Sequence, residues 1–266
     1  MIFFAILTKL YYIERGNMRS LDIIRQKRRF EMFSEKTKEK VLELNSFFGK
    51  YNMHYEEKIK KVFTYYDTPN CDLQKSNIVL YKTQIGKFTE LNMATEKINT
   101  TFRYTVRTNY KHFTKLIKPH DKILKHKDFL IDNFKAMFMS SLNFDPEFLL
   151  QKLQVAYVIE TTSVEYRSAN VTGLKITYSF DKDTYTNMFN NQKVSANVLT
   201  IYQHSSPKTD EDFDDLISKL TRYLKELTPT TETKIMIARR MTATKAEPIT
   251  KEKLDAMKKK IKKKKK

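Results

Sequence analysis

The chain has 266 residues, a net charge of +19 and a pI near 9.7, and 40% of its residues are hydrophobic. This composition can form a core and excludes a wholly disordered chain. The single cysteine, Cys71, excludes an internal disulfide and a cysteine-based zinc site. Eight of the last nine residues are lysines, and leaving them out of the net charge still gives +11. The body of the chain is therefore basic and should attract phosphate-bearing partners.

The amino-terminal apolar run, residues 2–7, is too short to cross a membrane, which takes about 20 apolar residues. It also lacks the flanking residues of a signal peptide. We expect a cytoplasmic protein without a membrane partner, in which residues 1–19 are an extension or translation begins at Met18. With only four glycines, the chain cannot form a glycine-rich phosphate loop.

The first half of the chain predicts mostly strands, because apolar and polar residues alternate in short runs. Ser34 is a suitable helix cap and Gly49 a suitable helix end, which predicts one helix between them. The expected order is a strand at 20–33, a helix at 34–49, strands at 58–67, 77–84 and 88–95, and a strand at 101–108.

The second half begins with helical spacing of apolar residues over 121–142, followed by a short helix that starts at Asp145-Pro146. A hairpin is predicted at 155–167 and 173–181, a strand at 195–203, a helix from Thr209 to about Leu227, and a last strand at 233–240. Residues 242–266 read as a flexible lysine-rich tail. Together the elements predict an α+β fold with an antiparallel eight-stranded closed or nearly closed β-barrel flanked by helices.

One segment of the sequence is distinctive enough to indicate a protein family. Residues 65–82, YYDTPNCDLQKSNIVLYK, resemble a segment of the CYTH superfamily, the triphosphate tunnel metalloenzymes, to which polyphosphate-polymerase domains are related. The order of the predicted elements is similar to that family over about residues 20–240. The resemblance implies a tunnel domain at 20–241 with a helical insert around 111–153.

Such a tunnel would hold triphosphate through lysine and arginine side chains that converge from several strands. Inward-facing positions of a barrel strand are every second residue. Candidates in that phase are Arg25, Lys27, Arg29, Arg103 and Arg107, and the resemblance adds Lys82, Arg167 and Lys175. We expect an interior rich in these cations and nearly free of acidic groups. The alternative is that these side chains simply face solvent on half-exposed strands.

The chain departs from the family where the metal would bind. Hydrolases of the family open with Glu-x-Glu-x-Lys, but here residues 25–29 read Arg-Gln-Lys-Arg-Arg, and Thr200 and Tyr202 replace a later glutamate pair. Magnesium prefers carboxylate oxygens. If the protein is active, the resemblance implies Mg²⁺ or Mn²⁺, with Glu165 and Asp181 as the remaining candidate ligands; the protein could equally use no metal.

The main hypothesis is therefore a CYTH-like protein that binds triphosphate, polyphosphate-type anions or a nucleotide in a basic tunnel, with metal-dependent hydrolysis weakened or lost. The first alternative is an active triphosphatase, acting on inorganic triphosphate, a nucleotide or an RNA 5′ end, or a polyphosphate polymerase. The second is a basic protein that associates with nucleic acid nonspecifically.

Overall fold

A single nine-stranded sheet dominates the computed structural model, which describes residues 26–32, 34–49, 52–100, 105–137, 145–169, 173–204 and 207–243. All strand pairs are antiparallel, in the order β5-β4-β3-β2-β6-β7-β8-β1-β9. The strands are β1 (Gln26–Met32), β2 (Asn52–Asp67), β3 (Ile78–Ile85), β4 (Phe88–Thr100), β5 (Thr105–Ile117), β6 (Gln154–Ala169), β7 (Lys175–Asn187), β8 (Gln192–Gln203) and β9 (Leu227–Thr230).

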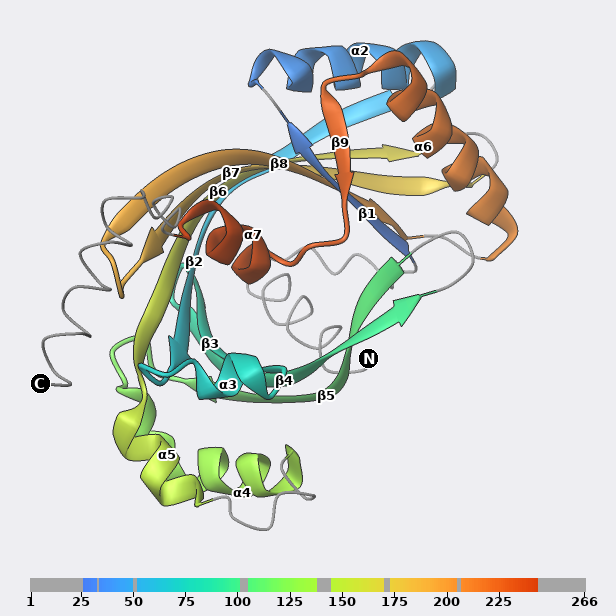
Figure 1. Ribbon diagram of the computed structural model, residues 1–266. Helices are drawn as coiled ribbons and strands as arrows, with labels where there is room; N and C mark the ends of the chain where they lie inside the picture. Colours follow the sequence, from blue (N-terminus) through green and yellow to red (C-terminus); the bar gives the residue numbers. More distant parts are fainter. Residues whose placement is uncertain are drawn as a thin grey trace, which may run out of the picture.

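The sheet is strongly curved, with most helices outside the curve and α7 inside it (Figure 1). The α-helices are α2 (Lys36–Gly49), α3 (Asp72–Lys75), α4 (Lys127–Met137), α5 (Pro146–Lys152), α6 (Asp210–Tyr223) and α7 (Lys234–Met241). Two short 3₁₀ helices are η1 (Ile123–His126) and η2 (Pro207–Thr209). None of the helices in the described ranges has the length and apolarity needed to cross a membrane.

The antiparallel α+β architecture is confirmed, but the eight-stranded closed barrel is not. The sheet has nine strands, and among the described residues it remains open, with β5 and β9 at its two edges. The ninth strand, β9, is four residues long and contains Pro229, which has no N–H to donate. A proline is tolerated on an edge strand and ends the hydrogen-bond ladder there.

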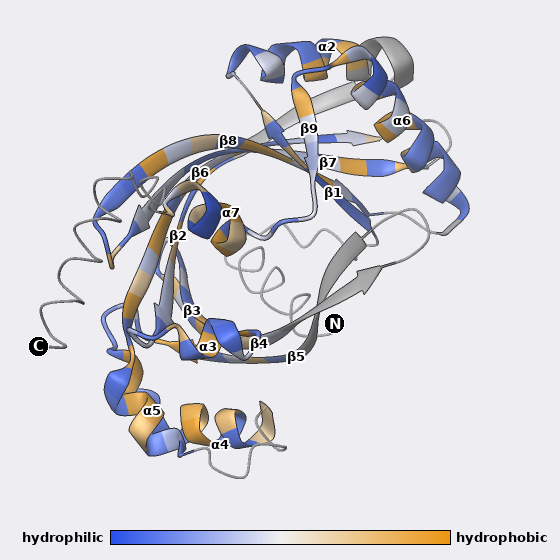
Figure 2. Cartoon of the chain, viewed as in Figure 1, coloured by the Kyte–Doolittle hydropathy of each residue, from blue (hydrophilic) through white to orange (hydrophobic). Residues whose placement is uncertain are grey.

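Two apolar cores lie on the convex face. One joins α2 and α6 to β1, β7 and β8, and includes Phe30, Tyr178 and Phe213, none more than 1% exposed. The other packs η1, α4 and α5 against β3 and β4. In Figure 2, α6 is mostly hydrophilic with an interrupted hydrophobic stripe, as expected for a helix with one buried side.

The segment 233–240, predicted as a strand, is instead helix α7, so that prediction is wrong. Its apolar residues Ile235, Ile237 and Ala238 are buried in a third core, on the concave face, with residues of β2, β3, β6, β7 and β8. Ile235 and Ile237 mimic the two-residue period of a strand. Ala238, three residues after Ile235, supplies the helical spacing that packing selects.

The Tyr-Asp-Thr-Pro segment forms the turn between β2 and α3. The buried Asp67 carboxylate accepts hydrogen bonds from the backbone N–H groups of Thr68, Leu73 and Gln74 at 2.8, 2.9 and 3.2 Å. Thr68 Oγ1 donates to Asp72 at 2.7 Å. These bonds fix the start of α3 and the direction in which β3 leaves the turn.

Candidate functional site

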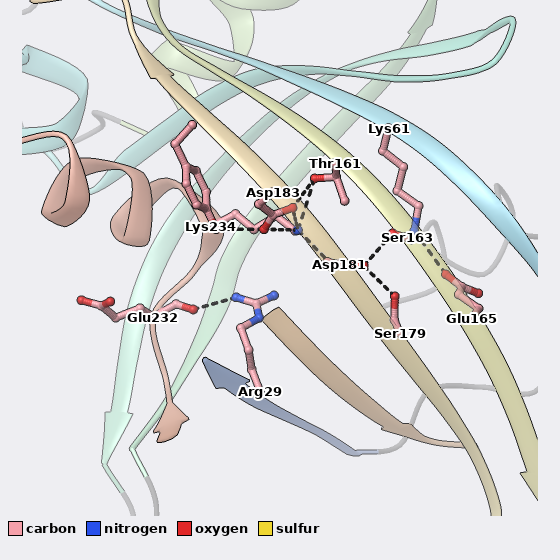
Figure 3. Close-up of polar contacts among 11 residues, drawn as sticks. Arg29, Lys61, Thr161, Ser163, Glu165, Ser179, Asp181, Asp183, Glu232 and Lys234 are labelled. Atoms are coloured by element: carbon pink, nitrogen blue, oxygen red, sulfur yellow. Dashed lines mark hydrogen bonds and ion pairs between the residues drawn. The ribbon is translucent and has the colours of Figure 1, made fainter. Parts of the chain in front are cut away.

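A polar cluster lies at the centre of the concave face. Between the two register shifts of the β2–β6 ladder, the odd-numbered residues of β2 and β6 lie on that face, as do those of β1 and β7. Lys61 pairs with Thr161, Thr161 pairs with Asp183, and Arg29 and Ser179 both pair with Thr200. Figure 3 shows the side chains converging from β1, β2, β6, β7 and the start of α7. We call this group the concave cluster: Arg29, Lys61, Thr161, Ser163, Glu165, Ser179, Asp181, Asp183 and Lys234.

Lys234, the first residue of α7, is the most highly coordinated cation of the concave cluster. Its Nζ lies 2.5 and 2.6 Å from the two carboxylate oxygens of Asp183 and 3.0 Å from Oδ2 of Asp181. It also donates to Thr161 Oγ1 at 3.3 Å. The side chain of Lys234 is only 12% exposed and that of Asp183 is fully buried, so this is a buried ion pair.

The remaining acids of the cluster are also paired. Asp181 Oδ1 accepts hydrogen bonds from Ser163 Oγ at 2.6 Å and Ser179 Oγ at 2.8 Å. Glu165 accepts from Lys61 Nζ at 3.3 Å. Each of the three carboxylates thus contacts a lysine, and the expectation of an interior nearly free of acids is wrong.

The protonation equilibria follow from this pairing. Burial alone would raise the pKa of Asp181, but the charges of Lys234 and Lys61 and the bonded hydroxyl groups outweigh it and hold the pKa below its ordinary value. Burial alone would lower the pKa of Lys61, but the charges of Glu165 and Asp181 raise it. Burial and the neighbouring Asp183 carboxylate raise the pKa of Tyr185, which donates to Asp183 Oδ2 at 2.8 Å. Each carboxylate of the concave cluster is therefore compensated by a lysine of the same cluster.

Two predicted site residues lie on the same face of β1: Arg29, which belongs to the concave cluster, and Lys27 beside it. They pair with Thr200 and Tyr202 of β8. Neither has a carboxylate partner in the described part of the chain. Burial and the positive charge of Arg29 lower the pKa of Lys27 to about 8, although the side chain keeps access to solvent. Arg29 Nη1 donates to the backbone oxygen of Glu232 at 2.6 Å.

An unusual pair of atoms lies here. Arg29 Nε and Thr200 Oγ1 are both buried, and neither has a hydrogen-bond partner among the described residues. Their residues are direct partners in the β1–β8 ladder. Buried polar groups are normally hydrogen-bonded, so a donor and a hydroxyl left together indicate a place for a polar ligand.

The other predicted residues are distributed differently. Arg167 lies on β6 in phase with Glu165, and Lys175 begins β7 in phase with Asp181. Lys82 pairs with Thr64 and faces the convex side, where its Nζ donates to the Pro119 carbonyl at 3.3 Å. Arg25 and Arg103 lie outside the described residues, as does the side chain of Arg107, whose backbone pairs with Ile98.

The residues present do not fit the divalent metal that the resemblance implies. Glu165 and Asp181, the candidate ligands, are occupied by Lys61 and Lys234. Over the described ranges, no three His, Cys, Asp or Glu side chains come together as a possible metal site. The Lys234 ammonium contacts the carboxylates of Asp181 and Asp183 and takes the place that a metal cation would occupy.

Sequence reasoning missed Lys61, Thr161, Ser163, Ser179, Asp183 and Lys234. The signal for the strand residues was present, because Thr161, Ser163 and Glu165 alternate along β6 just as Ser179, Asp181 and Asp183 do along β7. Lys234 could be found only after 233–240 is recognised as a helix.

No protein-family model and no curated protein sequence matches this chain. Among solved structures, it is similar to HpAC1 from Hippeastrum, an adenylyl cyclase candidate described with a dominant triphosphatase activity: 10% identity over 83% of this chain and 98% of that one, TM-score 0.46. It is similar to PH1819 from Pyrococcus horikoshii, with 12% identity over 81% and 99%, TM-score 0.45. It is also similar to an adenylate cyclase candidate from Bacillus halodurans, with 11% identity over 80% and 96%, TM-score 0.43.

Proposed function

We propose that the protein binds triphosphate or a related polyphosphate-type anion on the concave face, without metal-dependent hydrolysis. The observation that carries the proposal is the pair Arg29 Nε and Thr200 Oγ1, buried, adjacent and without a hydrogen-bond partner in the described part of the structure. A phosphate oxygen would accept from the guanidinium and the hydroxyl group together.

The charges around this point support an anion of limited size. Lys27, Arg29, Lys61 and Lys234 give four positive charges against three from Glu165, Asp181 and Asp183, so the net excess is small. Lys61 and Lys234 are committed to carboxylates, which leaves Lys27 and Arg29 as the binding cations. A charge-assisted hydrogen bond contributes about 1.5–3 kcal/mol, so a few such bonds support moderate affinity.

Hydrolysis is disfavoured by the same contacts. A metal-assisted phosphoryl transfer needs carboxylates free to hold the cation, and those of the concave cluster are neutralised by lysines of the chain. Phosphate release from inorganic triphosphate or ATP should therefore show no stimulation by Mg²⁺ or Mn²⁺. Metal-stimulated turnover would overturn this part of the proposal.

Binding is tested by calorimetric titration with inorganic triphosphate in the absence of metal, using the full chain. Arg29→Ala should weaken binding at least tenfold, whereas Arg222→Ala, which removes the same charge from the exposed end of α6, should not. A thermal melt of each variant checks that it is folded. Equal effects of the two substitutions, or tighter binding to single-stranded RNA than to triphosphate, would contradict the proposal.

A further inference from the structure

A cavity of about 450 Å³ lies between α3 and α7, apart from the concave cluster. Its polar lining comes from Gln74, Asn77, Arg239 and Arg240, and its apolar lining includes Val79 and Met236. The volume falls within the usual range of small-molecule sites, roughly 300–1,000 Å³. None of the residues of the concave cluster lines it.

Arg239 is the residue that gives this cavity a chemical preference. Its guanidinium makes no hydrogen bond or ion pair within the described residues, and its Nε is buried without a partner. The neighbouring arginine differs, because Arg240 pairs with Glu31 and with Glu232, the latter at 2.8 Å. Arg239 is therefore an uncommitted cation at the wall of a cavity, whereas Arg240 is neutralised.

The Asp67 carboxylate feels the charge of Arg239 but forms no hydrogen bond or ion pair with it. That charge acts to lower the pKa of Asp67. Burial has the larger effect and raises the pKa of Asp67, and three backbone N–H groups already occupy its oxygens. Arg239 therefore has room for an external anion.

From this geometry we propose that the cavity binds a small phosphate monoester. The guanidinium of Arg239 and the side-chain amides of Gln74 and Asn77 offer more donors than a carboxylate can accept, but suit the three oxygens of a phosphoryl group. Val79 and Met236 provide an apolar wall for the organic part of the ester. The cavity volume exceeds the volume of a free phosphate ion, which favours a phosphate monoester over inorganic phosphate as the ligand.

The test is calorimetric titration of the full chain with phenyl phosphate, inorganic phosphate and benzoate. The expected result is tightest binding of phenyl phosphate, loss of at least tenfold in Arg239→Ala, and a smaller loss in Arg239→Lys, which keeps the charge but not the planar fork. Gln74→Glu should not affect folding, because the Gln74 side chain is exposed. It should abolish binding, because it adds a carboxylate to the cavity that Arg239 lines. Arg222→Ala is the matched control and should bind as the wild type does.

Three outcomes overturn the proposal: no binding of phenyl phosphate, equal binding by wild type and Gln74→Glu, or tighter binding of benzoate. Binding of inorganic phosphate as tight as that of the ester overturns the assignment to a monoester. Arg29→Ala separates this site from the concave face. It should leave phenyl phosphate binding unchanged while it weakens triphosphate binding, so either site can fail without the other.

Discussion

Lys234 Nζ bridges both oxygens of Asp183, at 2.5 and 2.6 Å, across 51 residues of sequence. The bridge ties the first residue of α7 to the middle of β7 inside the curve of the sheet (Figure 3). It is at once the anchor of α7 and the counter-charge of the buried acids.

Replacing Lys234 by Met should therefore destabilise the fold by about 3–5 kcal/mol, because it leaves buried carboxylates without their cation. Urea unfolding measures the change. Lys219→Met, which removes an exposed i,i+4 partner of Asp215, should cost less than about 1 kcal/mol. Addition of Asp183→Asn to Lys234→Met should restore part of the loss, since it removes one uncompensated charge. A Lys234→Met variant as stable as Lys219→Met would show that the bridge contributes little.

Thr200→Val should leave stability unchanged or raise it by about 1 kcal/mol, because it removes a buried hydroxyl that has no partner. The same substitution should weaken triphosphate binding if Oγ1 serves the ligand. Unfolding and calorimetry on one variant measure both effects. Thr162→Val, on the opposite face of β6, is the control and should leave binding unchanged. Weaker stability together with wild-type binding would mean that the hydroxyl has a structural role.

The affinity for triphosphate should fall as the pH rises from about 7 to 9, since Lys27, with a pKa of about 8, loses its proton over that interval. Lys27→Arg keeps the charge at all these values. The ligand titrates identically for both proteins, so the difference between their pH profiles isolates residue 27. Superimposable profiles would exclude Lys27 from the binding site.

Acid should destabilise the protein partly through Asp181. Its pKa is lower in the folded chain than in the unfolded one, so the carboxylate contributes stability that is present above about pH 4 and lost as the pH falls through the folded value. Unfolding free energies measured from neutral pH down to about 3 should fall less steeply for Asp181→Asn than for the wild type. Parallel curves would assign the acid sensitivity to other carboxylates.

Sequence patterns were sufficient for most strands, because the alternation of apolar and polar side chains along a strand is a local property. β7 illustrates this: its outward residues Tyr178 and Phe180 and its inward residues Ser179 and Asp181 follow one another with period two. The strand β9 was missed because it is short and contains Pro229. The helix α7 was missed because eight residues fit either period until the concave face provides something to bury against.

The site was harder to predict for a different reason. Alternation along a strand shows which residues share a face, but the register with the neighbouring strands decides which face that is. Lys82 was expected in the tunnel, but it shares the convex face with the buried Leu80. The pairing of Asp183 with Lys234 is a long-range contact that no local pattern records. Lys27 and Arg29 did reach the concave face, because β1 keeps one phase along its length.

The turn built on Asp67 bears on how chains of this kind can be recognised. Among the described residues, the Asp67 carboxylate accepts hydrogen bonds only from backbone N–H groups of the turn. The sequence Tyr-Asp-Thr-Pro therefore meets a requirement of folding and does not indicate which chemistry the concave face performs. A chain can therefore keep this turn whatever its concave face binds, because the hydrogen bonds that build the turn involve no side chain of the concave cluster.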